Sequence, residues 1–227
     1  MRKAVVLLSG GLDSATTLYI ARSQGFRCFC LIFDYGQRHR REIKAAQRIA
    51  QIANCKLQIV KIALPWKGSS LLDKKINIPL RVKGIPSTYV PARNIIFLSF
   101  ALSYAETINA RAIFIGANAL DFSGYPDCRP EFYRAFRKII DSGTKSGAKG
   151  KKIQILTPLI KKKKAQIIKT GVRLGVPFEF TWSCYRGGIR PCEKCDSCYF
   201  RAKGFREAGI KDPLLAERQG DCSCKKI

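Results

Sequence analysis

The chain has 227 residues, 46% of them hydrophobic, which is enough apolar material to bury one sizeable core and a small appended module. Its 42 lysines and arginines outnumber its 16 aspartates and glutamates, so the formal net charge is +26 and anionic ligands are favoured. These basic residues are spread over many segments, which indicates a solvated basic surface rather than a dedicated nucleic-acid groove. No stretch approaches the roughly 20 apolar residues of a membrane span, and the first apolar run is too short for a signal peptide. We therefore expect a cytoplasmic protein with no membrane partner.

Short apolar runs alternate with helical patterns along the first 176 residues. The runs with strand character are 3–8, 27–35, 56–64, 111–117 and 153–156. Helical periodicity is found at 14–24, 38–54, 92–109, 130–141 and 162–174. Strands that alternate with helices form parallel sheets through right-handed crossovers. The sequence therefore predicts an α/β domain over 1–176, with a Rossmann-like parallel sheet of about five strands and helices on both faces.

Three segments depart from this alternation. Residues 65–86 have no clear period and are interpreted as an irregular excursion, a kind of loop that is often functional. Residues 142–152, SGTKSGAKGKK, are expected to be flexible and basic. After Val176 the chain becomes cysteine-rich. We expect 177–227 to form a small C-terminal module that binds zinc, ends in a short helix and packs on the α/β domain.

The string SGGLDS at 9–14 lies between the first predicted strand and the first predicted helix. Gly10 and Gly11 allow a sharp turn and a close approach to a ligand, while Ser9, Asp13 and Ser14 supply hydroxyls and a carboxylate. The helix that follows supplies unpaired N–H groups and the positive end of its dipole, so this loop is where phosphate should bind. An ordinary turn with Ser9 or Asp13 as N-cap is the plain alternative.

Four cysteines lie within fifteen residues, in the spacing C-x7-C-x2-C-x2-C: Cys184, Cys192, Cys195 and Cys198. Two successive C-x2-C steps let the sulfurs converge on one cation, and four thiolates leave no open position for water. We therefore predict one structural zinc, with an iron–sulfur cluster or four unrelated buried thiols as alternatives. Cys222 and Cys224 are interpreted as part of a flexible C-terminal tail, and Cys28 and Cys30 as core residues.

The SGGLDS string resembles the pyrophosphate loop of the N-type ATP pyrophosphatases, also called PP-loop enzymes, which cleave ATP between its α and β phosphates. The resemblance implies that this loop binds ATP, that Asp13 helps hold Mg²⁺, and that Lys164 is the family's single lysine before a helix. It makes Asp13 and Lys164 the expected catalytic residues. The expected ATP-binding residues are Leu8, Ser9, Gly10, Gly11, Leu12, Asp13, Ser14, Ala15, Thr16, Thr17 and Leu18.

Further strings narrow the resemblance, because they occur in one order over almost the whole chain: FDYGQRH, STYVPARN, DFSGYPDCRPEF and TWSCY, the last followed by the cysteine cluster. The ordered set closely resembles the 7-cyano-7-deazaguanine synthase family (QueC). Glu193 and Ala92 stand where glycine is common in that family, and neither position is a proposed ligand.

The family implies a homodimeric carbon–nitrogen ligase of the queuosine and archaeosine pathways. Such a ligase uses ATP to convert 7-carboxy-7-deazaguanine and ammonia into 7-cyano-7-deazaguanine through adenylylated acid and amide intermediates, and it releases AMP and pyrophosphate. The guanine edge calls for an acceptor and the substrate carboxylate for a cation. Our candidates are polar residues of the two middle strings: Tyr89, Arg93, Asn94, Asp121, Tyr125, Asp127 and Arg129. Turn formation and helix capping are their plain alternative.

Two other functions remain as alternatives. A PP-loop adenylyltransferase that modifies tRNA would use the same loop and could exploit the positive charge on RNA. A non-enzymatic zinc-bearing protein that binds nucleic acid would leave SGGLDS unexplained. We therefore expect no obligatory nucleic-acid partner.

Overall fold

Five parallel strands form the centre of the computed structural model, which describes residues 1–78, 84–120 and 125–216. The strands are β1 (Lys3–Leu7), β2 (Arg27–Asp34), β3 (Lys56–Lys61), β4 (Ala112–Ile115) and β5 (Gln154–Leu156). Their order in the sheet is β3-β2-β1-β4-β5. The central strand β1 pairs Val5 with Phe29 of β2 and with Ile113 of β4. The predicted fold class is thus confirmed.

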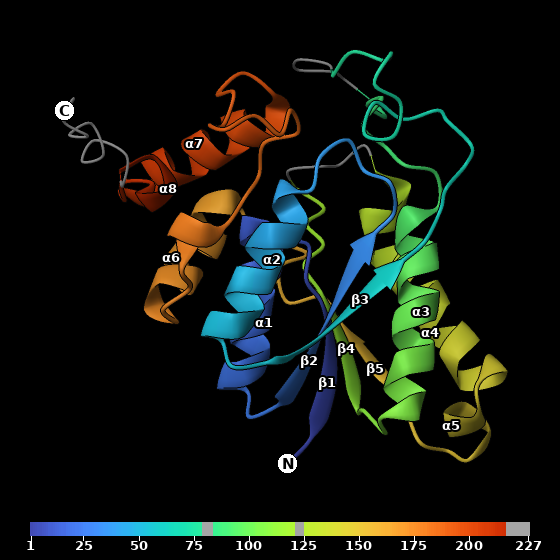
Figure 1. The fold of residues 1–227 in the computed structure, drawn as a ribbon. Helices are drawn as coiled ribbons and strands as arrows, with labels where there is room; N and C mark the ends of the chain where they lie inside the picture. Colours follow the sequence, from blue (N-terminus) through green and yellow to red (C-terminus); the bar gives the residue numbers. More distant parts are fainter. Residues whose placement is uncertain (79–83, 121–124, 217–227) are drawn as a thin grey trace, which may run out of the picture.

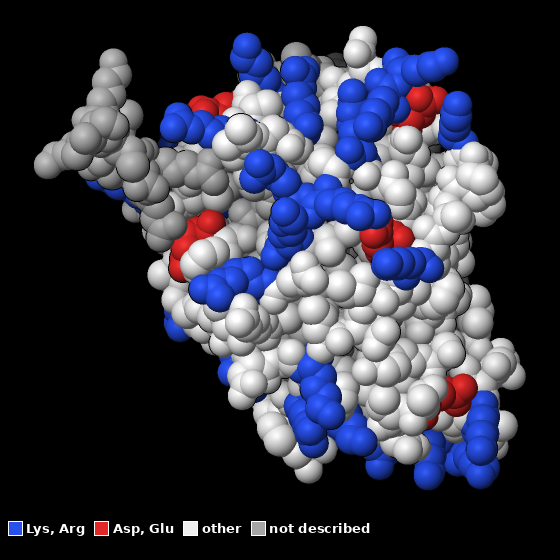
Figure 2. Space-filling view, in the orientation of Figure 1, with Lys and Arg blue, Asp and Glu red and all other residues white. Residues whose placement is uncertain are grey.

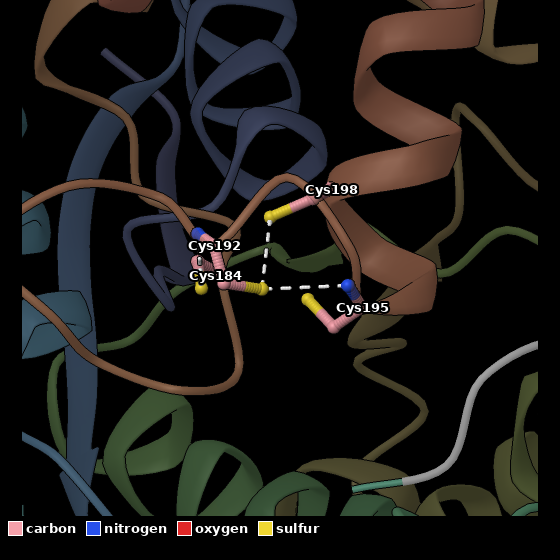
Figure 3. A group of neighbouring side chains, drawn as sticks. All are labelled: Cys184, Cys192, Cys195 and Cys198. Carbon is pink, nitrogen blue, oxygen red and sulfur yellow. Dashed lines mark hydrogen bonds between the residues drawn. The ribbon is translucent and has the colours of Figure 1, made fainter.

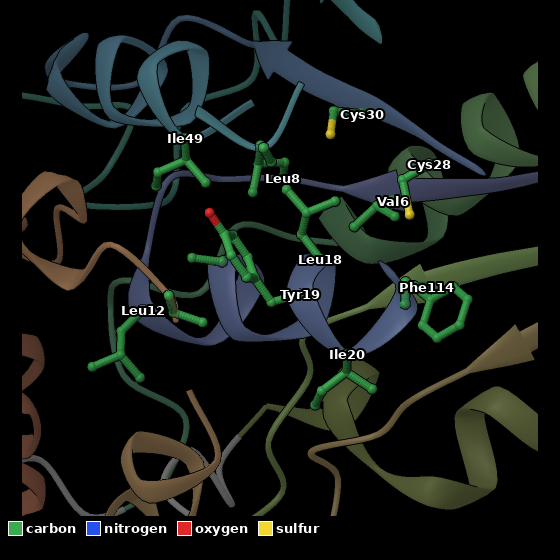
Figure 4. Packing of buried hydrophobic residues seen from close by; sticks show 14 of the residues in the cluster. Val6, Leu8, Leu12, Leu18, Tyr19, Ile20, Cys28, Cys30, Ile49 and Phe114 are labelled. Atoms are coloured by element: carbon green, nitrogen blue, oxygen red, sulfur yellow. The ribbon is translucent and has the colours of Figure 1, made fainter. Parts of the chain in front are cut away.

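Helices cover both faces of this sheet (Figure 1). One face carries α1 (Leu12–Ser23), α2 (Arg41–Ile52) and α6 (Lys164–Arg173), and the other carries α3 (Arg93–Thr107) and α4 (Pro130–Gly143). Successive side chains of a strand point to opposite faces. Val6 therefore packs with Leu18 and Ile49 on the first face (Figure 4), whereas Val5 packs on the second.

The cysteine-rich segment continues through two short elements and one long helix. These are η2 (Phe178–Phe180), α7 (Asp196–Ala208) and α8 (Pro213–Ala216). With 13 residues, α7 is longer than the short helix expected from the sequence. Gly204 of α7 lies so close to Lys164 and Ile168 that a Cβ would collide with them. This segment therefore packs directly on α6, while the predicted division at residue 176 stays a prediction.

Buried polar contacts also fasten α7. Arg201 pairs with Asp212 at 2.6 Å, and their side chains are 6% and 7% exposed. Arg201 also donates to Thr181 Oγ1 at 2.7 Å and to the carbonyl of Phe178 at 3.0 Å. Removing one partner of such a buried pair leaves an uncompensated charge, so this network holds α7 against η2.

Two other segments differ from expectation in detail. The basic stretch predicted to be flexible contains α5 (Lys145–Ala148), because the Thr144 hydroxyl accepts a hydrogen bond from Gly147 N at 2.9 Å and caps the turn. A short 3₁₀ turn, η1 (Pro126–Cys128), precedes α4. In the part of the chain that the structure describes, no helix is long and apolar enough to cross a membrane.

The glycine at position 10 is required by both conformation and space. Its φ is +82°, and a Cβ there would collide with the backbone of Glu42 and Ala46 in α2. Gly25 has a similar φ of +78° with open space around it. We expect Gly10→Ala to lower the free energy of unfolding by about 2–5 kcal/mol and Gly25→Ala by about 1–2 kcal/mol, because only the first adds a clash to the left-handed strain. Urea unfolding of both variants measures this difference, and equal losses would contradict the close approach.

Candidate active site

A cavity of about 250 Å³ opens at the carboxyl ends of β1 and β4. Leu7 and Ile115, the last residues of these two strands, form part of its floor. The two strands are neighbours in the sheet, although the chain passes through β2 and β3 between them. Such a reversal of strand order leaves a crevice where ligands bind in open α/β sheets.

The SGGLDS loop forms one wall of this cavity. The Ser14 hydroxyl donates to the carbonyl of Gly11 at 3.0 Å and lies 3.0 Å from the Ser9 hydroxyl. Gly11 is the N-cap of α1 and makes no side-chain cap, so the predicted alternative of a Ser9 or Asp13 cap is wrong. The first N–H groups of α1 are therefore free of a side-chain cap, as an anion-binding helix start requires.

Five of the eleven predicted ATP-binding residues line the cavity: Ser9, Gly11, Leu12, Asp13 and Ser14. The other six lie behind them and build the loop and the core: Leu8, Gly10, Ala15, Thr16, Thr17 and Leu18. Gly116, after β4, has no room for a larger side chain, because its Cβ would approach the backbone of Asp13 and Ser14 to 3.0 Å. The loop is thus held between α2 and the end of β4.

Asp13 and Lys164, predicted as catalytic residues, meet in the cavity across 151 positions of sequence. Lys164 Nζ donates to both carboxylate oxygens of Asp13, at 2.9 and 2.8 Å. Their side chains are 21% and 10% exposed, so a ligand in the cavity can reach both. Because Lys164 is the first residue of α6, the pair also connects the starts of α1 and α6.

The four predicted zinc ligands converge (Figure 3), and their sulfurs lie within 4.8 Å of one another. A tetrahedron with Zn–S bonds of about 2.3 Å has sulfur–sulfur edges of about 3.8 Å, so a small contraction would complete the site. Backbone N–H groups already point at the sulfurs: Cys192 N donates to Cys184 Sγ at 3.3 Å, and Cys195 N donates to Cys192 Sγ at 3.3 Å. The residues present therefore fit a metal.

Crowding of these thiols also changes their protonation. Hydrogen bonds from the Cys195 and Cys198 thiols lower the pKa of Cys184. The same contacts raise the pKa of Cys198 and raise that of Cys195 to about 11. A cation held among the four sulfurs would favour their thiolate forms.

Only some of the predicted substrate residues line the cavity. Arg93, Asn94 and Tyr125 line it, whereas Tyr89, Asp127 and Arg129 are not among its described lining residues. Asp121 lies outside the described residues, as do Cys222 and Cys224.

Capping and turn contacts occupy several of these candidates. Asn94 N donates to Asp127 Oδ2 at 3.3 Å and Asn94 Nδ2 to the carbonyl of Asp127 at 3.2 Å, which joins η1 to the first turn of α3. Burial raises the pKa of Asp127. Arg129 is exposed at the N-cap of α4, and Tyr89 Oη accepts from Ala92 N at 3.3 Å. Burial also raises the pKa of Cys128 to about 12, so this thiol is a poor nucleophile.

Sequence reasoning missed several residues of the cavity wall. The cysteine-rich segment contributes Trp182 and Tyr185, and the helices contribute Glu42 and Phe97. Trp182 N donates to the carbonyl of Gly10 at 2.9 Å and its Nε1 donates to the carbonyl of Cys184 at 2.9 Å. The four-cysteine cluster is therefore connected to the SGGLDS loop through one residue, Trp182. The string TWSCY marked this region, but no spacing rule assigns it to a cavity.

A protein-family model described as "Queuosine biosynthesis protein QueC" matches residues 3–209. The chain belongs to this family. It is 52% identical over 227 residues to "7-cyano-7-deazaguanine synthase 2" of Desulfitobacterium hafniense (strain Y51), a match that covers 99% of this chain and 97% of that protein. It is 51% identical to "7-cyano-7-deazaguanine synthase" of Thermoplasma volcanium, covering 100% of this chain and 95% of that protein. The predicted family is thus confirmed, and so is the prediction that the chain is an enzyme.

Solved structures resemble the fold at low sequence identity. An NMN synthetase from Francisella tularensis matches with a TM-score of 0.50 and 18% identity, covering 97% of this chain and 79% of that one. A 4-thiouridine synthetase in complex with RNA and ATP matches with a TM-score of 0.51 and 19% identity, covering 98% of this chain and 54% of that one. At this identity the likeness concerns the fold alone.

Proposed function

We propose that this chain is an ATP-dependent carbon–nitrogen ligase that converts 7-carboxy-7-deazaguanine and ammonia into 7-cyano-7-deazaguanine. The relatives named 7-cyano-7-deazaguanine synthase support the substrate and product. The observation that carries the chemistry is the SGGLDS loop with the Asp13–Lys164 pair in one cavity. A carboxylate oxygen is a poor leaving group, so activation by an adenylyl group must come before ammonia can replace it.

Two adenylylations account for the reaction. The substrate carboxylate attacks the α-phosphorus of ATP and pyrophosphate leaves; ammonia then attacks the acyl carbon and AMP leaves with one carboxylate oxygen. The amide oxygen attacks a second ATP in the same way, and loss of a second AMP and the remaining N–H protons gives the nitrile. One acid, one ammonia and two ATP thus yield one nitrile, two AMP and two pyrophosphates.

The geometry of the cavity supports the following roles. The open start of α1 and the Ser9 and Ser14 hydroxyls hold the pyrophosphate as charge develops on it. Lys164 turns from Asp13 toward the phosphates, which places a cation beside the leaving group. The lone pairs that Asp13 keeps would hold the Mg²⁺ that accompanies ATP. Arg93 lines the same cavity and is the candidate cation for the substrate carboxylate.

Zinc is the metal we propose for the four-cysteine cluster, where it would hold Cys184, Cys192, Cys195 and Cys198 together and take no part in the chemistry. We also propose that the enzyme works in the cytoplasm as a homodimer. The resemblance to the family is what supports the homodimer.

The test incubates purified protein with ATP, Mg²⁺, ammonium and 7-carboxy-7-deazaguanine and identifies the products by mass. We expect the nitrile with two AMP and two pyrophosphates for each nitrile formed. ADP with phosphate, or an unchanged acid, would contradict the proposal. Added tRNA should leave turnover unchanged, whereas a strict tRNA requirement would favour the RNA-modifying alternative. Lysines and arginines lie in several separate groups on the face in Figure 2, which gives that alternative no single basic stripe there.

A further inference from the structure

The Glu42 side chain lines the cavity and has no role in the steps above. It is the second residue of α2, and the phosphate loop fixes its backbone, because Gly10 packs directly against the carbonyl of Glu42. Among the described residues, two carboxylates line this cavity, Asp13 and Glu42. Asp13 is held by Lys164, whereas the Glu42 carboxylate makes no hydrogen bond or ion pair within the described chain.

The surroundings of Glu42 make the charged form of this carboxylate unfavourable when no ligand is bound. Burial raises the pKa of Glu42, Arg93 nearby lowers it, and the Cys184 sulfur raises it further. The Arg93 guanidinium donates instead to Tyr35 Oη at 3.2 Å and forms no ion pair with Glu42 in the described structure. A partly buried acceptor without a donor carries a desolvation cost, which a ligand with N–H groups would remove.

The proposed substrates differ in what they offer to such an acceptor. The guanine edge of a 7-deazaguanine carries two adjacent donors, N1–H and the 2-amino group, which match the two oxygens of one carboxylate. The adenine edge of ATP places its amino group beside an acceptor nitrogen, so it cannot fill both oxygens. Phe97 and Tyr125 line the same cavity and offer apolar ring surface for a flat heterocycle.

We propose that Glu42 reads the guanine edge of the substrate and so determines its specificity for deazaguanines. This inference rests on the proposed function, and it concerns a residue that neither the motifs nor the predicted site residues include. In this arrangement the guanine edge of the ring pairs with Glu42, and the substrate carboxylate stays free to attack ATP bound in the same cavity.

The experiment compares 7-carboxy-7-deazaguanine with its analogue that lacks the 2-amino group. Three proteins are compared: the wild type, Glu42→Gln and the surface control Glu207→Gln. For each, turnover of both compounds is measured with ATP and ammonium, and their binding without ATP is measured by calorimetry. We expect the wild type and Glu207→Gln to prefer the amino compound by about 100-fold in kcat/KM, because loss of the 2-amino donor leaves one oxygen of the buried carboxylate unpaired. Glu42→Gln should lose about 10- to 100-fold with the amino compound and nearly all of the preference, with the KM for ATP unchanged.

Results that contradict the role of Glu42 can be distinguished from results that contradict the proposed function. A preference that survives in folded Glu42→Gln would overturn the proposal, and so would a raised KM for ATP with the preference intact, which would assign Glu42 to the nucleotide. If Glu42→Gln fails to fold, the wild type still decides, because equal binding of the two compounds would overturn the proposal. A wild type that makes nitrile from neither compound would instead refute the proposed function.

Discussion

Replacing Cys195 with serine should release the metal and unfold the segment that forms one wall of the cavity. Cys195 is fully buried, and its cluster is connected to the phosphate loop through Trp182. Structural zinc contributes about 10–16 kcal/mol of apparent binding free energy in small zinc modules, which is as large as the whole stability of a typical domain. We therefore expect loss of metal, a large fall in Tm and loss of nitrile formation together.

The control for this experiment is Cys55→Ser, a half-buried cysteine outside the cluster. Elemental analysis measures the metal content, and circular dichroism measures thermal unfolding. In both measurements Cys55→Ser should behave like the wild type. Full metal content and unchanged Tm in Cys195→Ser would refute the structural metal site.

The second large effect is expected at Lys164. Lys164→Met removes the cation beside the leaving pyrophosphate, and the loss of one such group costs about 10²–10³-fold in kcat. Asp13→Ala should be at least as severe, because it removes the partner of Lys164 and the carboxylate proposed to hold Mg²⁺. Both variants should keep the metal and the fold, since the pair lies at the cavity rather than in the core.

Lys161→Met is the matched control, since Lys161 is an exposed neighbour in the same run of four lysines and does not line the cavity. Exchange of labelled pyrophosphate into ATP in the presence of the acid measures adenylylation alone. Equal exchange in Lys164→Met and Lys161→Met would contradict the proposed role of Lys164.

Local patterns predicted what depends on neighbours along the chain. Buried runs such as 3–8 and 27–35 can be satisfied only inside a sheet covered on both faces, and the structure has them there as β1 and β2. The C-x2-C steps likewise brought three of the four cysteines together by spacing alone. The meeting of Asp13 and Lys164 required the family resemblance, because no periodicity relates positions so far apart.

The rest of the site depends on tertiary contacts that no local pattern encodes. Glu42 lies in a helix with an ordinary amphipathic pattern, and only the approach of Gly10 to α2 brings it to the cavity. Asp127 shows the converse. It lies in the string DFSGYPDCRPEF and is a candidate substrate residue by sequence, but its carboxylate accepts a hydrogen bond from Asn94 N in the first turn of α3. Polar residues in turns serve as caps as readily as they bind ligands, and sequence does not distinguish the two.

In the proposed reaction, both oxygens of the substrate carboxylate are transferred to AMP. Substrate acid labelled with ¹⁸O at both carboxylate oxygens tests it most directly, with the AMP and pyrophosphate read by mass spectrometry during nitrile formation. Two successive adenylylations predict one labelled oxygen in every AMP and none in pyrophosphate. Unlabelled AMP, or label in pyrophosphate or phosphate, would contradict two successive adenylylations.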